Sequence, residues 1–255
     1  ELSHVFSLGQ RADDLTRQTA AAWAESNNVV LHPHTRVENI DTSARIVRTT
    51  AGDFGYAKLV LATGAEAILP PVPGSELLYT LNSQQEYKRC EAELANAKRV
   101  LLIGGGLIGT EIAMDFNRAG KDVTVTDRSA GLLASLLPPE ISARLQRRLM
   151  DNGVNFMFKK EIIEISRHHD SLIATFSDGH RQSFDAVVCA IGLCPAVALA
   201  REAGIEVRRG IVVSDTLATS AEDVYALGDC AEIQGKLMPY PVSYTHLRAH
   251  ETGAY

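Results

Sequence analysis

The chain has 255 residues, of which 45% are hydrophobic and 22% are charged, and its net charge is −6 at pH 7. This balance is typical of a folded protein with one large domain or two small ones. The negative charge supplies no basic surface for nucleic acid, and no apolar run approaches the roughly 18–20 residues that span a bilayer. We therefore expect neither a nucleic-acid partner nor a membrane partner.

The cysteines indicate the compartment in which the protein works. They stand far apart, at Cys90, Cys189, Cys194 and Cys230. Four scattered cysteines are too few for the disulfide framework of a small secreted protein. We predict a reducing, cytoplasmic location, and we expect no metal site because the histidines lie mainly at polar turns or alternate along a strand.

The first predicted element is a helix over residues 10–27. This stretch is rich in helix formers, and Leu15, Ala22 and Trp23 are spaced to share one face. The pattern predicts an amphipathic helix that packs through that face.

Extended segments follow this helix. Apolar and β-branched residues predict strands over residues 29–41 and 44–50, with a turn over 51–55. Residues 56–65 predict a continuous apolar strand that runs into Thr63–Gly64. Such a run is typical of a strand that is buried on both faces.

The middle of the chain alternates between helix and strand. Helices are predicted over residues 83–97, 107–120 and 138–153, and strands over 99–103 and 121–127. Alternation of this kind, with apolar strands, predicts a parallel sheet in the α/β class.

An antiparallel meander and one further buried strand are predicted next. Three short strands surround polar turns at residues 168–170 and 177–179, and residues 184–192 then form an apolar run. The α/β sheet is thus expected to carry a small antiparallel sheet beside it.

A glycine motif, Gly104-x-Gly106-x-x-Gly109, lies between the strand over 99–103 and the helix that follows. The first glycine permits a tight turn, the second lets the backbone approach a pyrophosphate, and the third allows close packing of helix on strand. The N–H groups at the start of the helix point at the phosphates. The motif in this context predicts a dinucleotide site.

Asp127 closes the next strand, where a carboxylate binds the hydroxyl groups of the adenosine ribose. A 2′-phosphate is repelled by this negative charge. The sequence therefore favours NAD(H) over NADP(H), although Arg128 beside the carboxylate argues in the other direction.

Three further stretches carry a resemblance to a known family: "KLVLATGA", "DAVVCAIGLCP" and "TSAEDVYALGDCAE". They resemble the two-dinucleotide-binding flavoprotein reductases, which are related in fold to glutathione reductase. The resemblance implies two Rossmann-like domains, with an NAD domain inserted into an FAD domain. It also implies a set of cofactor-binding residues that surround the inserted domain: Thr63, Gly64, Gly192, Gly228 and Asp229. Among them, Asp229 is expected to bind the ribityl chain of FAD, and Gly192 to line the nicotinamide side.

The same resemblance implies an incomplete fold, because the phosphate loop of the FAD domain and the family's C-terminal interface domain have no counterpart in the sequence. We expect a βαβ unit of roughly 30 residues to lie outside it. The predicted division is a first FAD segment at residues 1–82, an NAD(H) domain at 83–195, a second FAD segment at 196–241 and a non-native tail at 242–255. The tail "VSYTHLRAHET" back-translates to a sequence like a transposase adaptor, so we hypothesise that native sequence stops near Pro241.

The small FAD-dependent NADH:rubredoxin reductases are the part of this family that the chain resembles more closely. Stretches such as "PPVPGSELLYTLNSQQEY", "GGGLIGTEIAMDFNRAGK" and "VYALGDCAEI" carry this resemblance. It implies hydride transfer from NADH to FAD, followed by single-electron transfer to a rubredoxin-type iron centre. Flavorubredoxin, in nitric oxide detoxification, is the favoured acceptor. Glu111 resembles a family carboxylate that lies near the flavin and pairs with a lysine.

Other functions stay open at this point. An NADH oxidase or peroxidase of this fold carries a redox cysteine in a Leu-Ser-Cys context, where this chain has Leu2-Ser3-His4, and histidine forms no sulfenic acid. A disulfide reductase needs a dithiol, for which Cys189 and Cys194 are the candidates. A ferredoxin reductase of the same fold and a module that only binds NAD are further alternatives.

Overall fold

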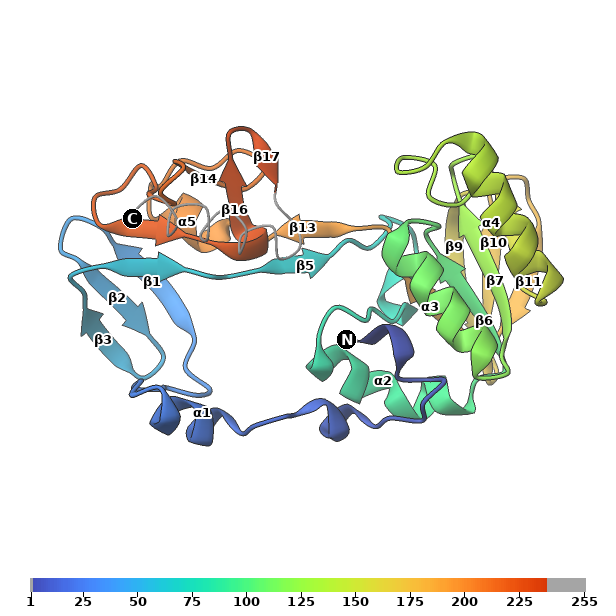
Figure 1. Cartoon of the computed structure of the whole chain (residues 1–255), viewed down its shortest axis with the longest axis horizontal. Helices are drawn as coiled ribbons and strands as arrows, with labels where there is room; N and C mark the ends of the chain where they lie inside the picture. Colours follow the sequence, from blue (N-terminus) through green and yellow to red (C-terminus); the bar gives the residue numbers. More distant parts are fainter. Residues whose placement is uncertain (1, 238–255) are drawn as a thin grey trace, which may run out of the picture. The chain divides into compact units, whose positions relative to one another are not determined.

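The computed structural model describes residues 2–237 and divides into two compact units (Figure 1). The first unit comprises the described residues before Ala20 together with Ala67–Gly192. The second unit comprises Ala20–Glu66 together with the described residues from Leu193 onward. The tail predicted to be non-native, and Pro241, lie outside the described residues.

The first unit is built on a parallel sheet with the strand order β12-β6-β7-β8. An antiparallel sheet with the order β11-β10-β9 accompanies it. The strands of the first unit are β6 (Arg99–Ile103), β7 (Asp122–Asp127), β8 (Asn155–Phe158), β9 (Ile162–His168), β10 (Ser171–Phe176), β11 (Arg181–Phe184) and β12 (Ala186–Cys189). Its helices are η1 (Leu2–His4), η2 (Ala12–Leu15), η3 (Ser75–Leu77), α2 (Gln84–Asn96), α3 (Leu107–Arg118) and α4 (Pro139–Asp151). The predicted order of helices and strands from residue 83 to residue 192 is confirmed except for β8, the edge strand of the parallel sheet, which was not predicted.

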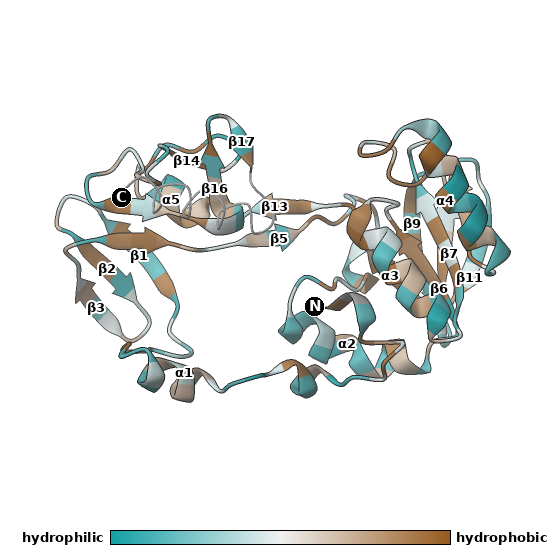
Figure 2. Cartoon of the chain, in the orientation of Figure 1, coloured by the Kyte–Doolittle hydropathy of each residue, from teal (hydrophilic) through white to brown (hydrophobic). Residues whose placement is uncertain are grey.

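The parallel sheet has a different partner on each face. In β6, Val100 and Leu102 pack with helix residues such as Phe116, whereas Leu101 packs with the meander strands and residues such as Phe176. Because successive side chains of a strand point to opposite faces, this run of apolar residues serves two cores. Figure 2 shows that α4 is mostly hydrophilic.

A capping side chain, prolines and a glycine mark the ends of the helices in the first unit. Ser83 is the N-cap of α2, and its side chain accepts a hydrogen bond from the Glu86 N–H at 3.2 Å. Pro138 and Pro139 open α4. Gly120, with φ of +81°, directly follows Ala119, the C-cap of α3, in the left-handed conformation that favours glycine.

The second unit is made of short strands and small sheets. β1 (Val37–Asp41), β2 (Ile46–Thr49) and β3 (Gly52–Gly55) form an antiparallel sheet, and β4 (Leu59–Leu61) pairs in parallel with β15 (Val224–Ala226). The remaining elements are α1 (Ala20–Ser26), β5 (Ala65–Ala67), β13 (Leu193–Pro195), α5 (Ala198–Glu202), β14 (Ile211–Val213), η4 (Gly228–Cys230), β16 (Ala231–Ile233) and β17 (Lys236–Leu237). β5 pairs with β13, and β14, β16 and β17 form one sheet.

The helix predicted over residues 10–27 is wrong. The structure has η2 and α1 instead, and Trp23 is 48% exposed. The backbone of Thr16 is extended, with φ of −80° and ψ of 105°, so it ends η2. The N–H of Arg11 binds the Asp14 carboxylate at 2.8 Å, which closes a short turn in place of a longer helix.

The strands predicted in the second unit are longer than those observed. In the predicted strand over 29–41 only β1 is formed, and this segment contains Pro33, which has no N–H to donate to a ladder. The turn predicted over 51–55 is instead β3, because the chain reverses one residue earlier, where the Thr49 hydroxyl donates to the Gly52 carbonyl at 2.8 Å. The predicted strand over 56–65 is reduced to β4.

The division into compact units differs from the predicted boundary at residue 82. Residues 67–82 belong to the first unit, where the Tyr79 N–H donates to the Val187 carbonyl at 2.9 Å beside β12. The described residues before Ala20 belong there too. Which cofactor each part of the chain holds stays a prediction.

A buried carboxylate attaches the N-terminal segment to α3. Asp115 is 1% exposed and accepts hydrogen bonds from the N–H groups of Phe6 at 2.8 Å and Ser7 at 3.0 Å. The Phe6 ring lies 4.4 Å from that of Phe116 and 5.4 Å from that of Tyr87, measured between centroids. A charge buried this deeply is stable only when it is hydrogen-bonded, so Asp115 and this segment depend on each other.

We expect Asp115→Ala to lower the free energy of unfolding by about 2–4 kcal/mol, because it leaves two partly buried N–H groups without an acceptor. Urea unfolding followed by circular dichroism measures this loss, and hydrogen exchange at Phe6 and Ser7 locates it. Asp151→Ala, which removes an exposed carboxylate from the end of α4, is the control and should change stability by less than about 0.5 kcal/mol. Equal stability of the two variants would contradict the anchoring role.

Candidate functional site

The glycine motif forms a loop between β6 and α3 in which backbone segments come very close. Gly104 has φ of +112°, and a Cβ on this residue would lie 2.4 Å from the Ala190 carbonyl oxygen. A Cβ on Gly109 would lie 2.0 Å from the Gly104 carbonyl oxygen. Since real Cβ atoms do not approach oxygen so closely, both positions require glycine. The close packing predicted for the third glycine of the motif is therefore observed.

Gly106 differs from the other two glycines of the motif. It is the N-cap of α3, and a Cβ there would meet nothing within 4 Å. The fold itself therefore does not need glycine at this position, and the free space is where a phosphate could approach the backbone. No side chain caps α3, so the first N–H groups of this helix remain available to an anion.

Asp127 lies at the end of β7, directly beside the glycine loop. Its Oδ2 atom accepts a hydrogen bond from the Gly105 N–H at 2.6 Å, and its Oδ1 atom accepts one from the Ser129 N–H at 2.6 Å. The Gly105 carbonyl in turn accepts from the Leu133 N–H at 2.7 Å. Sequence reasoning missed Gly105, because the motif treats this position as variable.

Gly192 follows β12 at the same edge of the parallel sheet. Its φ is +129°, and its carbonyl accepts a hydrogen bond from the Ile68 N–H at 3.0 Å. Because β12, β6 and β7 are parallel neighbours, the loops after them meet at one edge. Ligands of open α/β sheets bind at this carboxyl edge. The structure thus gathers the residues predicted for the NAD(H) site on one side of the first unit: Gly104, Gly106, Gly109, Asp127 and Gly192.

Glu111 lies in α3, just past its first turn, and its side chain is partly exposed. Within residues 2–237 it forms no ion pair. Its role near a flavin stays a prediction.

The second unit has its own carboxyl edge, formed by the parallel pair of β4 and β15. Thr63 and Gly64 follow β4, and Gly228 and Asp229 follow β15. The Leu227 N–H donates to the Leu61 carbonyl at 3.0 Å, so the two strands stay paired up to the point where these loops begin. The four residues predicted for the FAD site therefore lie at one edge.

The loop at Thr63–Gly64 is held in place by Ala196. The Thr63 hydroxyl donates to the Ala196 carbonyl at 2.6 Å, and the Ala196 N–H donates to the Gly64 carbonyl at 3.0 Å. Gly228, with φ of +77°, has open space around it, and the Asp229 side chain is partly exposed. A carboxylate beside an open glycine can accept hydrogen bonds from the hydroxyl groups of a ligand.

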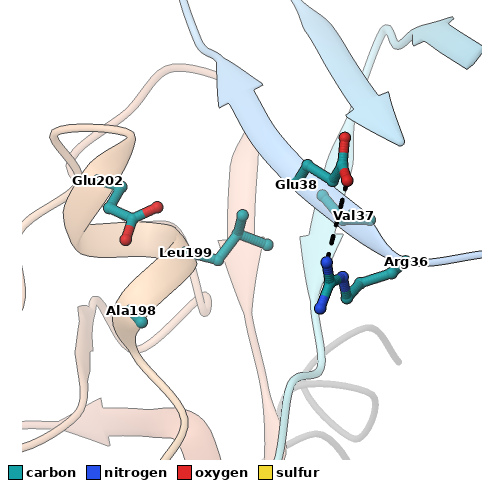
Figure 3. Close-up of a pocket in the computed structure, with 6 residues that line it drawn as sticks. All are labelled: Arg36, Val37, Glu38, Ala198, Leu199 and Glu202. Carbon is teal, nitrogen blue, oxygen red and sulfur yellow. Dashed lines mark ion pairs between the residues drawn. The ribbon is translucent and has the colours of Figure 1, made fainter. Parts of the chain in front are cut away.

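A cavity in the second unit holds none of these residues. It lies between β1 and α5, measures about 350 Å³ and is lined by Arg36, Val37, Glu38, Ala198, Leu199 and Glu202 (Figure 3). Its one cationic group, Arg36, lies 4.0 Å from the Glu38 carboxylate. We assign no cofactor to this cavity because its lining is mainly acidic and its one cationic group already lies beside a carboxylate.

Three of the four cysteines are buried. All four are free thiols, and Cys194 alone is exposed. Burial raises the pKa of the Cys90 thiol to about 12 and also raises that of Cys189 above its ordinary value. Since the thiolate is the reactive form, burial makes both side chains poor nucleophiles.

No helix between residues 2 and 237 is both long enough and apolar enough to cross a membrane.

The sequence is similar to a known protein family and to individual proteins of known name. The sequence profile described as "Pyridine nucleotide-disulphide oxidoreductase" matches residues 4–246. The Nitric oxide reductase FlRd-NAD(+) reductase of Escherichia coli O139:H28 (strain E24377A / ETEC) is 54% identical over 240 residues. The match covers 94% of this chain and 64% of that protein, so the chain spans less than two thirds of its curated relative.

Two solved structures are similar as well. A ferredoxin reductase from Rhodopseudomonas palustris is 28% identical with a TM-score of 0.84, and the match covers 94% of this chain and 61% of that one. The covalent complex of putidaredoxin reductase and putidaredoxin contains a chain that is 27% identical with a TM-score of 0.86, covering 97% of this chain and 63% of that one.

Two alanine substitutions separate the role of the fold from that of the ligand. We expect Gly109→Ala to destabilise the protein by about 1–3 kcal/mol, because the new Cβ overlaps the Gly104 carbonyl. Gly106→Ala should change stability by less than about 1 kcal/mol but weaken NADH binding at least about tenfold, or roughly 1.4 kcal/mol. Thermal unfolding and NADH fluorescence titration measure the two effects. Full NADH affinity in Gly106→Ala would exclude a phosphate at this position.

Thiol chemistry can be tested by alkylation. In the native chain we expect iodoacetamide to modify Cys194 first, and to leave Cys90 and Cys189 unmodified, since both are buried. Peptide mass spectrometry reads each site, and the chain unfolded in guanidinium is the control in which all four thiols react. Fast modification of native Cys189 would revive the dithiol alternative.

Proposed function

Because the chain belongs to the pyridine nucleotide-disulphide oxidoreductase family, we propose that the whole protein is an FAD-dependent oxidoreductase that oxidises NADH. It passes the electrons one at a time to a rubredoxin-type iron centre, with flavorubredoxin as the acceptor, in the detoxification of nitric oxide. The observation that carries this proposal is the 54% identity to the E. coli FlRd-NAD(+) reductase, together with the glycine loop and Asp127 at one sheet edge. We place the protein in the cytoplasm.

The first unit supplies the NAD(H) site. Gly106 and the N-terminus of α3 receive the pyrophosphate, whose negative charge the helix dipole stabilises. Asp127 accepts hydrogen bonds from the ribose hydroxyls, since each of its oxygens retains a lone pair beyond the one used for a backbone N–H. Gly192 lines the nicotinamide side. The carboxylate disfavours a 2′-phosphate, and NADH is therefore the preferred donor.

The second unit supplies part of the FAD site. Thr63, Gly64, Gly228 and Asp229 lie at the carboxyl edge of β4 and β15, and Asp229 accepts from hydroxyl groups of the ribityl chain. FAD, when bound, provides the conversion of a two-electron hydride into single-electron steps. Glu111 contributes a negative charge near the flavin and pairs with a lysine of the whole protein.

The burial of two thiols favours an electron-transfer function over disulfide or peroxide chemistry. A redox cysteine needs an accessible thiolate, and burial holds Cys90 and Cys189 in the thiol form. At the position where the peroxidases carry their cysteine, this chain has His4. Direct hydride transfer between two bound cofactors requires no protein nucleophile.

The test uses the whole protein, purified with FAD and kept anaerobic. We expect NADH to bleach the flavin absorbance, and oxidised rubredoxin to restore it quickly, because the flavin then gives up its electrons singly. Ferredoxin and hydrogen peroxide are added in parallel, and both should act slowly. NADPH replaces NADH in a further run and should bleach the flavin more slowly.

Asp229→Ala serves as the matched variant, since it removes the predicted ribityl contact and leaves the glycine loop unchanged. We expect it to lose FAD during purification. Rapid reoxidation by peroxide with idle rubredoxin would favour an NADH peroxidase, and rapid reoxidation by ferredoxin would favour a ferredoxin reductase. A whole protein that binds NADH but holds no FAD would be a module that only binds NAD.

A further inference from the structure

Both oxygens of the Asp127 carboxylate are engaged by the chain itself. One accepts the Gly105 N–H and the other accepts the Ser129 N–H, each at 2.6 Å. These are short, charge-assisted hydrogen bonds, a class roughly twice as strong as bonds between neutral groups. If Asp127 served only to bind a ribose, it would not need a hydrogen bond to the backbone of the glycine loop.

The Gly105 peptide is held on both of its sides. Its N–H donates to Asp127, while its carbonyl accepts from the Leu133 N–H at 2.7 Å. A Cβ on Gly105 would lie 3.3 Å from the Leu132 side chain and 3.4 Å from Asp127 Oδ2. The Gly104 N–H also donates to the Thr126 carbonyl at 2.8 Å. The loop is therefore fixed by the last two residues of β7 and by the segment that follows them.

This arrangement matters because a phosphate loop binds its ligand through N–H groups that point at the phosphates. A loop that already has its bound conformation loses less entropy when the ligand arrives. The Asp127 charge by itself acts in the opposite sense, since a carboxylate near a pyrophosphate repels it. The two effects have opposite signs, so an experiment can tell them apart.

We propose that Asp127 is a positioning residue for the phosphate loop, which it holds through the Gly105 N–H, in addition to binding the ribose. The inference rests on the proposed NAD(H) site and deepens it. Removal of the carboxylate should then weaken even a nucleotide that has no ribose hydroxyls for it to bind.

Three variants of the full 255-residue chain test the idea. Asp127→Ala removes both acceptors and the charge, whereas Asp127→Asn removes the charge and the bond to Ser129 but keeps one oxygen that can accept from Gly105. Asp122→Ala is the matched control, because it removes a carboxylate from the opposite end of the same strand, where it accepts from Asn155 at 3.1 Å.

Calorimetric titration uses two probes, ADP and 2′,3′-dideoxy-ADP, which lacks both ribose hydroxyls. We expect Asp127→Ala to weaken dideoxy-ADP about tenfold, because the released loop then has to be ordered when the nucleotide binds. Asp127→Asn and Asp122→Ala should bind it within about threefold of the native chain. Equal or tighter binding of dideoxy-ADP by Asp127→Ala would overturn the proposal, since Asp127 would then act on ribose and charge alone.

A second measurement needs no nucleotide and no destabilising variant. The amide proton of Gly105 in the ligand-free native chain should resonate far downfield, as a proton donated to a carboxylate at 2.6 Å does, and exchange slowly. Asp127→Asn should keep most of this protection. An ordinary chemical shift with fast exchange in the native chain would overturn the proposal.

Failure of this inference is distinct from failure of the proposed function. Neither measurement uses FAD, NADH oxidation or an iron protein, so idle rubredoxin in the electron-transfer assay leaves the positioning role intact. If the native chain binds neither ADP nor dideoxy-ADP, the glycine loop is not a nucleotide site, and the positioning role is overturned with it.

Discussion

A Cβ on residue 109 would lie 2.0 Å from the carbonyl oxygen of Gly104. The helix α3 can therefore begin directly against the end of β6 only because Gly109 has no side chain. The same loop passes the Ala190 carbonyl at a distance that also excludes a Cβ on Gly104. Three backbone segments therefore meet at the carboxyl edge of the parallel sheet. This contact places the N-terminus of α3, and with it the open position at Gly106, where an anion can reach them.

The two units follow one geometric rule. In parallel strands every carboxyl end faces the same edge, so loops that are distant in sequence become neighbours there. In the first unit the rule joins the loops after β6, β7 and β12, and in the second unit it joins those after β4 and β15. Polar and glycine residues collect on these loops while the strands remain apolar, which separates the binding chemistry from the core.

Carboxylates that accept two backbone N–H groups recur in this chain, and their burial separates their roles. Asp115 accepts from Phe6 and Ser7, and Glu232 accepts from Arg209 and Gly210; these carboxylates are 1% and 3% exposed. Both attach a peripheral segment to the core and present nothing to solvent. Asp127 makes the same kind of contact but stays partly exposed, so it can hold the loop and still face a ligand.

Sequence patterns predicted the first unit well because its elements are encoded over short distances. Apolar periodicity located β6, α3, β7 and α4 to within a few residues, and the spacing of three glycines located the loop. The second unit was predicted less well, since its strands are short and its apolar runs are broken by Pro33 and Gly64. The failed helix over 10–27 shows that helix-forming composition does not by itself form a helix where polar side chains close local turns.

The sequence by itself determined the class of the fold, the glycine loop and the candidate residues, because a tight turn, a close approach and an amphipathic face each depend on neighbouring positions. Only the tertiary structure decided which distant groups act together. The bond from Gly105 to Asp127, the attachment of Phe6 to Asp115 and the pairing of β4 with β15 all join segments far apart in the chain. No local pattern encodes such pairs, since they arise when parallel strands align and backbone N–H groups find their acceptors.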